Sequence, residues 1–167
     1  MATPRTLLIV YHSHTGGTAQ MARAAAEAAA AAEPALAVRL QRAVDTGPAD
    51  VLAAEGYLFA TPEMLAAMAG PMKDFFDRCY YPVLGRVEGR PYAALVCAGS
   101  DGTGAARQLQ RMATGWRLRA VASPLVVCTH AQTPEAIVAP KRIGEEDLGR
   151  CAELGAALAS GIALGVF

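Results

Sequence analysis

The sequence predicts an α/β protein built on a parallel sheet that helices cover on both faces. Five short apolar runs alternate along the chain with longer segments of helical pattern. Four of the runs are apolar at nearly every position, which is typical of parallel strands that are buried on both sides. The composition agrees, because 53% of the 167 residues are hydrophobic and supply enough apolar surface for a core on each face. A single domain spanning residues 1–167 is therefore expected.

The predicted elements follow one another in the order β-α-β-β-α-β-α-β-α. The strands are expected at 6–11, 35–40, 56–60, 92–98 and 124–128, and the helices at 17–32, 69–80, 103–114 and 145–164. The second strand alternates apolar and polar residues, so we expect it at an edge of the sheet. A loop with one helical turn, at 49–54, connects it to the third strand.

Charge and cysteine content narrow the range of partners. The chain carries 15 basic and 15 acidic residues, so its formal net charge is zero and no overall field attracts nucleic acid, an anionic membrane or an acidic partner. The four cysteines lie in apolar stretches without C-x-x-C spacing. We expect reduced core thiols, and neither a metal site nor disulfides, at Cys79, Cys97, Cys128 and Cys151.

Two terminal apolar runs are too short for a signal peptide or a membrane anchor. The run near the N-terminus has five residues, and the run at 154–167 has 14, whereas a spanning helix needs about 20. We therefore expect a cytoplasmic protein without membrane insertion. The C-terminal run is expected to form a buried or interface helix.

Function is expected at the loops that follow strands one, three and four. Ligands of open α/β sheets bind outside the carboxyl ends of the strands, where the strand order reverses. The first loop places hydroxyl groups and a Gly-Gly pair before a helix start, as phosphate sites do. Its residues are Ser13, His14, Thr15, Gly16, Gly17 and Thr18. It lacks the lysine of a Walker A loop and the G-x-G-x-x-G dinucleotide fingerprint. An ordinary capped helix start is the alternative.

The second loop could flank a flat aromatic ligand, and the third loop is rich in glycine. After the third strand, Pro62 is expected to end the strand with a sharp exit. The rim of the site would then be formed by Glu63, Met64 and Leu65. Plain packing is the alternative for the methionine. The third loop is rich in glycine, which brings the backbone close to a ligand or forms a flexible turn. It contains Gly99, Ser100, Asp101 and Gly102.

Three stretches of the sequence resemble the flavodoxin-like superfamily. They are LLIVYHSHTGGTAQMARAAAE, FATPEMLAAMAGPMKDFFDR and VCAGSDGTGAARQLQ. Within the superfamily the chain looks like the FMN-dependent NAD(P)H:quinone oxidoreductases of the tryptophan-repressor-binding-protein type. The T-P pair followed by M-A-G-x-M-K-x-F-x-D carries most of this likeness. The resemblance implies a three-layer sandwich with a five-stranded parallel sheet in the order 2-1-3-4-5.

The resemblance also implies a cofactor and its binding residues. It implies FMN held without a covalent bond, with the first loop at the phosphate, the second beside the isoalloxazine ring and the third at the far edge of the ring. His130 falls near a histidine that the quinone reductases carry beside the flavin, although an ordinary loop histidine is the alternative. NADH or NADPH would be the electron donor, and a quinone-like molecule the acceptor. A homodimer or higher homo-oligomer is expected, with the small-residue C-terminal helix as a packing face.

The chain departs from the quinone reductases at two places, so the resemblance predicts the cofactor better than it predicts the substrate. The segment 42–56 is short where those enzymes have a long one that contributes to tetramers and to the substrate pocket. Met64 stands where they have an arginine. A flavodoxin-type electron carrier is the second hypothesis, but such carriers are usually acidic and this chain has no net charge. The third hypothesis is a flavodoxin-like interaction module that has lost FMN. No acid, base or nucleophile stands out, as expected where a flavin carries the chemistry.

Overall fold

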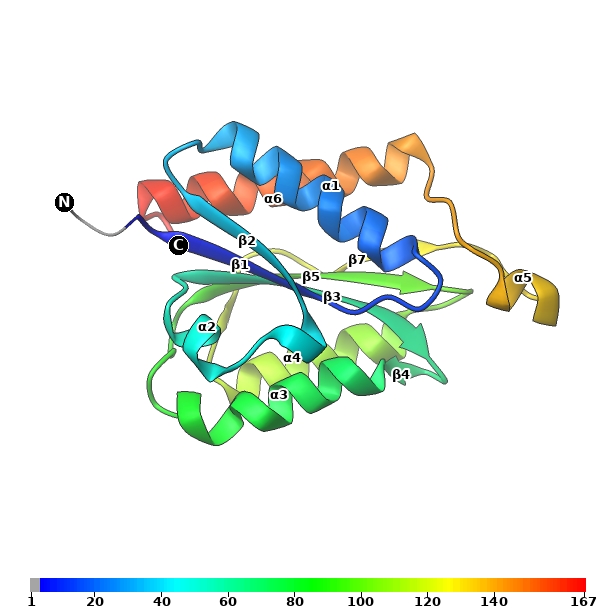
Figure 1. Ribbon diagram of the computed structural model, residues 1–167, viewed down its shortest axis with the longest axis horizontal. Coiled ribbons are helices and arrows are strands. Elements are labelled where there is room, and N and C mark those ends of the chain that lie inside the picture. The colour runs from blue at the N-terminus through cyan, green and yellow to red at the C-terminus, as the bar shows by residue number, and fades with distance from the viewer. Residues whose placement is uncertain (1–3) are drawn as a thin grey trace.

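A largely parallel sheet lies between two layers of helices (Figure 1). The computed structural model describes residues 4–167. Helices α1 (Gly17–Ala32) and α6 (Glu145–Leu164) cover one face of the sheet. Helices α3 (Gly70–Val83) and α4 (Thr103–Gly115) cover the other. The α/β flavodoxin-like arrangement is therefore confirmed.

Within residues 4–167, the sheet contains seven strands. They are β1 (Thr6–Tyr11), β2 (Ala37–Arg42), β3 (Gly56–Met64), β4 (Ala67–Met68), β5 (Pro91–Ala98), β6 (Arg119–Ala120) and β7 (Leu125–Cys128). The order across the sheet is β2-β1-β3-β5, and both β6 and β7 pair with the outer side of β5. All of these pairings are parallel except that of β3 with β4.

The prediction of five strands is wrong in number, although the five predicted runs occupy the predicted order. Strand β6 pairs with the beginning of β5 and β7 with its end, so these two strands share one position at the sheet edge. Pro124, which has no N–H group to donate, lies between them just before β7. Strand β4 is a short antiparallel partner of β3. Strand β2 also begins at residue 37 and not at 35.

Strand β3 continues past Pro62, so the expected exit at this proline is wrong. The strand ends at Met64. Its inner neighbour β1 stops opposite Ala60, whose carbonyl oxygen accepts the last bond on that side, from the N–H of His12. Pro62 faces the same side two residues later, where no strand follows, so its missing N–H costs no bond of the sheet.

The two faces of the sheet have different cores. On the α3 and α4 side, aromatic side chains pack together around Phe59, whose ring centroid lies 4.9 Å from that of Phe76. The predicted core stripe of α3 is buried here: Met72, Phe75, Phe76 and Cys79. On the other side, α1 presents mainly alanines, and α6 approaches so closely that a Cβ on Gly155 would lie 2.2 Å from the carbonyl oxygen of Ala25. The C-terminal run, predicted as a buried or interface helix, forms the second half of α6 and packs on α1, although residues 163–166 are exposed.

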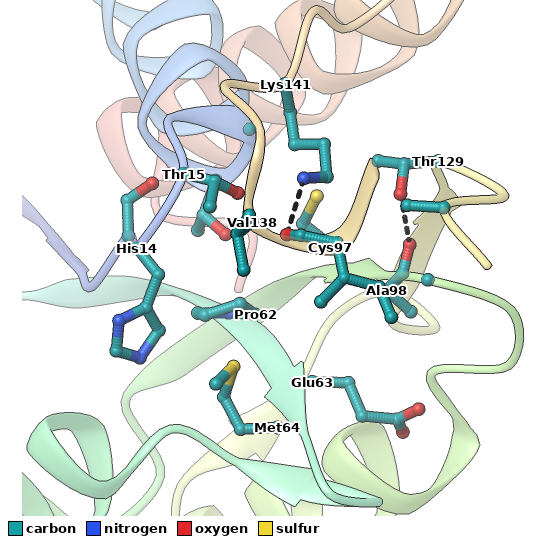
Figure 2. Close-up of a pocket in the computed structure, with 16 residues that line it drawn as sticks. His14, Thr15, Pro62, Glu63, Met64, Cys97, Ala98, Thr129, Val138 and Lys141 are labelled. Carbon is teal, nitrogen blue, oxygen red and sulfur yellow. Dashed lines mark hydrogen bonds between the residues drawn. The ribbon is translucent and has the colours of Figure 1, made fainter. Parts of the chain in front are cut away.

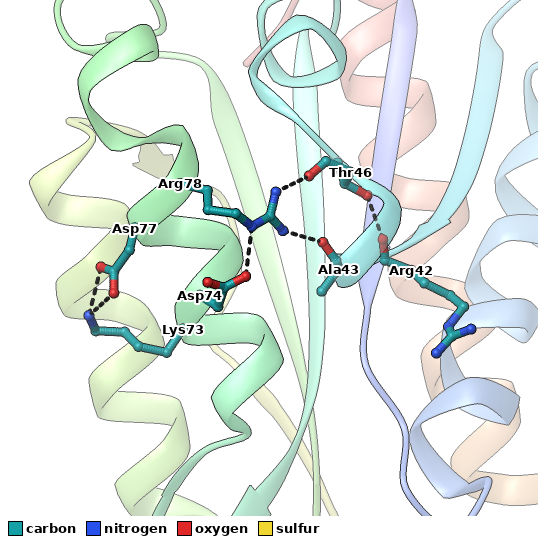
Figure 3. Close-up of polar contacts among 7 residues, drawn as sticks. All are labelled: Arg42, Ala43, Thr46, Lys73, Asp74, Asp77 and Arg78. Carbon is teal, nitrogen blue, oxygen red and sulfur yellow. Dashed lines mark hydrogen bonds and ion pairs between the residues drawn. The ribbon is translucent and has the colours of Figure 1, made fainter.

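A short connection between β2 and β3 is fastened to α3 by one arginine (Figure 3). The connection consists of the 3-10 turn η1 (Ala43–Asp45) and helix α2 (Pro48–Leu52). The Arg78 guanidinium donates to the carbonyl oxygens of Ala43 at 2.8 Å and Thr46 at 2.9 Å, and to the Asp74 carboxylate at 2.6 Å. These bonds explain how a segment of this length stays ordered beside α3.

The last connection carries a helix that was not predicted, α5 (Pro134–Val138), between β7 and α6. It lies at the carboxyl edge of the sheet, away from the two helical layers (Figure 1). Across residues 4–167, each helix is too short or too polar to cross a bilayer. Three of the four free cysteines are buried, and Cys128 is partly exposed.

Candidate functional site

A cavity of about 430 Å³ opens at the carboxyl edge of the sheet (Figure 2). The three predicted loops contribute Ser13, His14, Thr15, Gly17, Thr18, Pro62, Glu63, Met64 and Gly99 to its lining. The remaining lining residues were not predicted: Cys97, Ala98, Thr129, Ala131, Ile137, Val138 and Lys141. Five predicted binding residues lie outside the lining: Gly16, Leu65, Ser100, Asp101 and Gly102. The cavity is therefore bordered by the three predicted loops and by a fourth segment, which follows β7.

The first loop presents an uncapped helix N-terminus to the cavity. Gly16 takes a left-handed conformation, with φ of 93°, and turns the chain into α1. Its N–H donates to the Ser13 hydroxyl oxygen at 3.2 Å, which closes the turn. No side chain caps the first turn of α1. Free N–H groups at a helix start attract anions.

Thr18 carries a buried hydroxyl group beside the cavity. Its side chain has 1% of its surface exposed, and its Oγ1 has no nitrogen or oxygen partner, although the Cys97 thiol lies close to it. A buried polar group without a partner is costly, so such a group is usually completed by a ligand or water. Gly17 beside it has no room for a side chain, because a Cβ would lie 2.8 Å from the Cys97 Sγ. Gly17 thus lets the start of α1 pack closely against Cys97 at the edge of the cavity.

Cys97 lies on the cavity floor as a buried thiol. Burial raises its pKa, an effect that the Thr18 hydroxyl and the Lys141 charge only partly oppose. The thiolate is the reactive form of cysteine, so this residue is unsuited to act as a nucleophile near neutral pH. Within residues 4–167, no group of three His, Cys, Asp or Glu side chains is placed to hold a metal ion.

The second loop is a tight hairpin between β3 and β4. Leu65 and Ala66 at its tip have φ values of 51° and 64°, a left-handed conformation that non-glycine residues seldom adopt. Leu65 is fully exposed, and Met64 is 42% exposed at the cavity rim. A Cβ on Gly104 of α4 would lie 2.0 Å from the Ala66 carbonyl oxygen. Close contact with α4 therefore holds the hairpin in place.

Glu63 connects the second loop with the third. Its carboxylate accepts from the N–H groups of Gly102 at 2.9 Å and Ala105 at 3.2 Å, so it caps α4 from a neighbouring strand. Figure 2 shows its side chain pointing away from His14 and the first loop. Asp101 acts locally, since its carboxylate accepts from the N–H and hydroxyl groups of Thr103. Both acidic groups of these loops are thus engaged at the start of α4.

The fourth segment, residues 129–143, is joined to the first loop by hydrogen bonds. The Lys141 N–H donates to the Thr15 carbonyl oxygen at 2.8 Å. The Gln20 side chain, on α1, donates to the Lys141 carbonyl oxygen at 2.8 Å and accepts from the Ile143 N–H at 3.1 Å. Ile137 completes this side of the cavity together with Val138, which stays 74% exposed although it lines the cavity. This segment forms an apolar side wall.

Three basic side chains gather where β1 and β2 end. His12 Nε2 and His14 Nε2 lie 3.3 Å apart. Burial lowers the pKa of His12, and the nearby charges of His14 and Arg42 lower it further. His130 lies elsewhere, at the end of β7, where its N–H donates to the Gly99 carbonyl oxygen at 2.8 Å. Its side chain is exposed and is not part of the cavity lining.

Comparison with known proteins identifies a flavin-dependent family. Residues 41–133 match the sequence model of the family described as NADPH-dependent FMN reductase. A curated protein named Flavodoxin, from Aquifex aeolicus (strain VF5), is 32% identical over 98 residues, which make up 59% of this chain and 52% of that protein. The chain thus matches about half the length of this curated relative.

Solved structures share the whole fold at lower identity. A flavodoxin from the domain Archaea aligns with a TM-score of 0.76 and 18% identity, covering 95% of this chain and 99% of that one. A WrbA-like flavodoxin from Agrobacterium tumefaciens aligns with a TM-score of 0.68 and 19% identity, covering 96% and 98%. Because the family match covers more than half of the chain, the protein belongs to the NADPH-dependent FMN reductase family, and it shares the flavodoxin-like fold with WrbA-type relatives.

Proposed function

We propose that the protein binds FMN non-covalently in the cavity and transfers electrons from NADH or NADPH to a quinone-like acceptor. The observation that carries this proposal is the uncapped N-terminus of α1, which borders the cavity at Gly17 and the buried Thr18. Both lie at one end of a cavity whose size falls within the range of about 300–1,000 Å³ of ligand pockets. A phosphate group would satisfy the free donors, and the apolar walls suit a flat ring.

The residues present fit FMN in three places. Ser13, Thr15 and Thr18 would surround the phosphate with the first turn of α1, while the left-handed turn at Gly16 lets these residues converge. Pro62, Met64 and Val138 would border the ring. Bound FMN supplies the capacity to accept a hydride from a nicotinamide and to pass electrons onward. The protein supplies position, apolar contact and exclusion of water.

The family description supports the donor, since it names NADPH. The acceptor rests on the resemblance to quinone reductases alone. An electron carrier without its own NAD(P)H activity is the second candidate, and the 32% identical relative named Flavodoxin favours it. The two candidates share the cofactor and differ in whether nicotinamide reduces the protein.

Flavin binding is tested by titrating FMN with the purified protein and following quenching of flavin fluorescence. Thr18→Val, which keeps the shape of the side chain, should weaken FMN binding about tenfold or more, because a charge-assisted hydrogen bond contributes about 1.5–3 kcal/mol. Thr114→Val is the matched control, since that hydroxyl donates to the Gln110 carbonyl oxygen on the exposed end of α4. Wild-type protein that leaves FMN fluorescence unquenched would refute the cofactor.

Reductase activity is tested on the FMN complex without oxygen. NADPH or NADH should bleach the flavin absorbance near its visible maximum, and an added quinone should restore it. Dithionite serves as the positive control for reduction. If dithionite bleaches the flavin and neither nicotinamide does, the reductase proposal is refuted and the carrier is supported.

A further inference from the structure

One lysine reaches the phosphate end of the cavity from the segment after β7. The main chain of Lys141 is bonded to Thr15 and Gln20, and its Cβ lies 3.4 Å from the position that a Cβ on Gly17 would occupy. Its side chain lines the cavity, and Figure 2 shows its ammonium group bonded to a carbonyl oxygen, that of Ile137. The positive charge of Lys141 also opposes the rise that burial imposes on the Cys97 pKa. The lysine therefore lies beside the uncapped start of α1.

The ammonium group is held in a single position by carbonyl oxygens. It donates to those of Ala136 and Ile137 at 2.8 Å each and to that of Ala139 at 2.6 Å. These acceptors are neutral, and Lys141 has no carboxylate within ion-pair distance among residues 4–167. Its charge is thus fixed in place and left without a counter-ion. A fixed charge loses little side-chain entropy when a ligand arrives.

The rest of the cavity lining has little charge to offer a phosphate. Besides Lys141, the lining has two side chains that can carry a charge, Glu63 and His14. Glu63 is negative, and its carboxylate accepts hydrogen bonds from the start of α4. His14 is exposed, and Figure 2 shows its ring on the side of Met64, away from Lys141. A phosphate monoester carries about −1.5 to −2 charges at pH 7. The start of α1 offsets only about half a charge. Lys141 is the one permanently positive side chain of the lining.

We propose that Lys141 is a specificity-determining residue, whose ammonium group makes the site select phosphorylated flavin over flavin without phosphate. The proposal rests on the flavin site proposed above and adds a residue outside the first loop to it. The ammonium acts through its charge and through its fixed place beside the first loop. Riboflavin, which has the same ring and ribityl chain as FMN without the phosphate, isolates this contribution.

The test compares dissociation constants of FMN and riboflavin, measured by fluorescence quenching at low and high salt. Lys141→Met should weaken FMN binding about tenfold at low salt and change riboflavin binding less than twofold. Lys141→Arg should retain most of the preference for FMN, because it retains the charge. Arg142→Met is the matched control, since this neighbouring cation is exposed and outside the cavity lining, and it should leave both constants unchanged.

The ratio of the two dissociation constants decides the outcome. An unchanged ratio in Lys141→Met overturns the proposal. Equal losses for both flavins also overturn it, since they would assign the lysine to holding α5 in place and not to the phosphate. A wild-type protein that binds neither flavin would refute the flavin site as a whole, a result distinct from an unchanged ratio.

Discussion

Replacement of Glu63 tests whether one carboxylate holds two parts of the site together. Glu63→Ala removes the acceptor of the Gly102 and Ala105 N–H groups, at 2.9 and 3.2 Å, and leaves the start of α4 uncapped. Loss of a capping side chain costs about 0.5–2 kcal/mol. Because this carboxylate is charged and accepts two bonds, we expect the upper end, about 2 kcal/mol. For a chain of this size that loss lowers Tm by about 4–8 °C.

The assay is urea unfolding followed by far-ultraviolet circular dichroism. Glu63→Gln should lose about half as much stability as Glu63→Ala, because its amide keeps one acceptor oxygen and gives up the charge. Glu88→Ala is the matched control, since Glu88 makes only a surface ion pair with Arg117 and should cost less than about 0.5 kcal/mol. If Glu63→Ala costs no more than this control, the carboxylate does not hold α4 to β3.

Two further predictions concern helix packing and protonation. Gly155→Ala places a Cβ 2.2 Å from the Ala25 carbonyl oxygen, so the free energy of unfolding, measured in urea, should fall by about 1–3 kcal/mol. Gly149→Ala is the control, because its Cβ meets no atom within 4 Å and should not lower that free energy. Equal losses in the two variants would contradict the close packing of α6 on α1. In an NMR titration of the imidazole rings, His12 should titrate below 6.5 and shift upward in His14→Asn. At pH values between the lowered pKa of His12 in the folded protein and 6.5, the unfolded chain binds more protons than the folded one. His12 should therefore lower the stability of the protein as the pH falls through this window. Titration of His12 at or above 6.5 would contradict its burial.

The sequence predicted the main sheet because its strands are continuous apolar runs. Strands β4 and β6 were missed, since two residues carry no periodic signal. The end of β3 was misplaced because Pro62 is an ordinary strand breaker by sequence. Only the position at which β1 ends makes this proline tolerable, and that depends on the register between strands.

The site was predicted where the residues are close in sequence. The first loop gathers its hydroxyls, glycines and helix start within six residues, and the cavity does open there. Lys141 and Val138 were missed because their segment has no periodic pattern and reaches the first loop through Gln20, more than a hundred residues earlier. Glu63 was predicted at the rim of the site, but not its bonds to α4. These bonds depend on how the end of β3 lies beside the end of β5, which no local sequence pattern shows.

The pairing of α1 with α6 has a consequence for how the chain is made in the cell. Helix α1 leaves the ribosome well before α6, yet the buried alanines of α1 pack against α6 and the sheet. Until α6 has emerged, the nascent chain must carry an uncovered apolar strip on α1. Truncation before residue 145 would leave that strip permanently open, and we expect such fragments to be bound by chaperones or to aggregate.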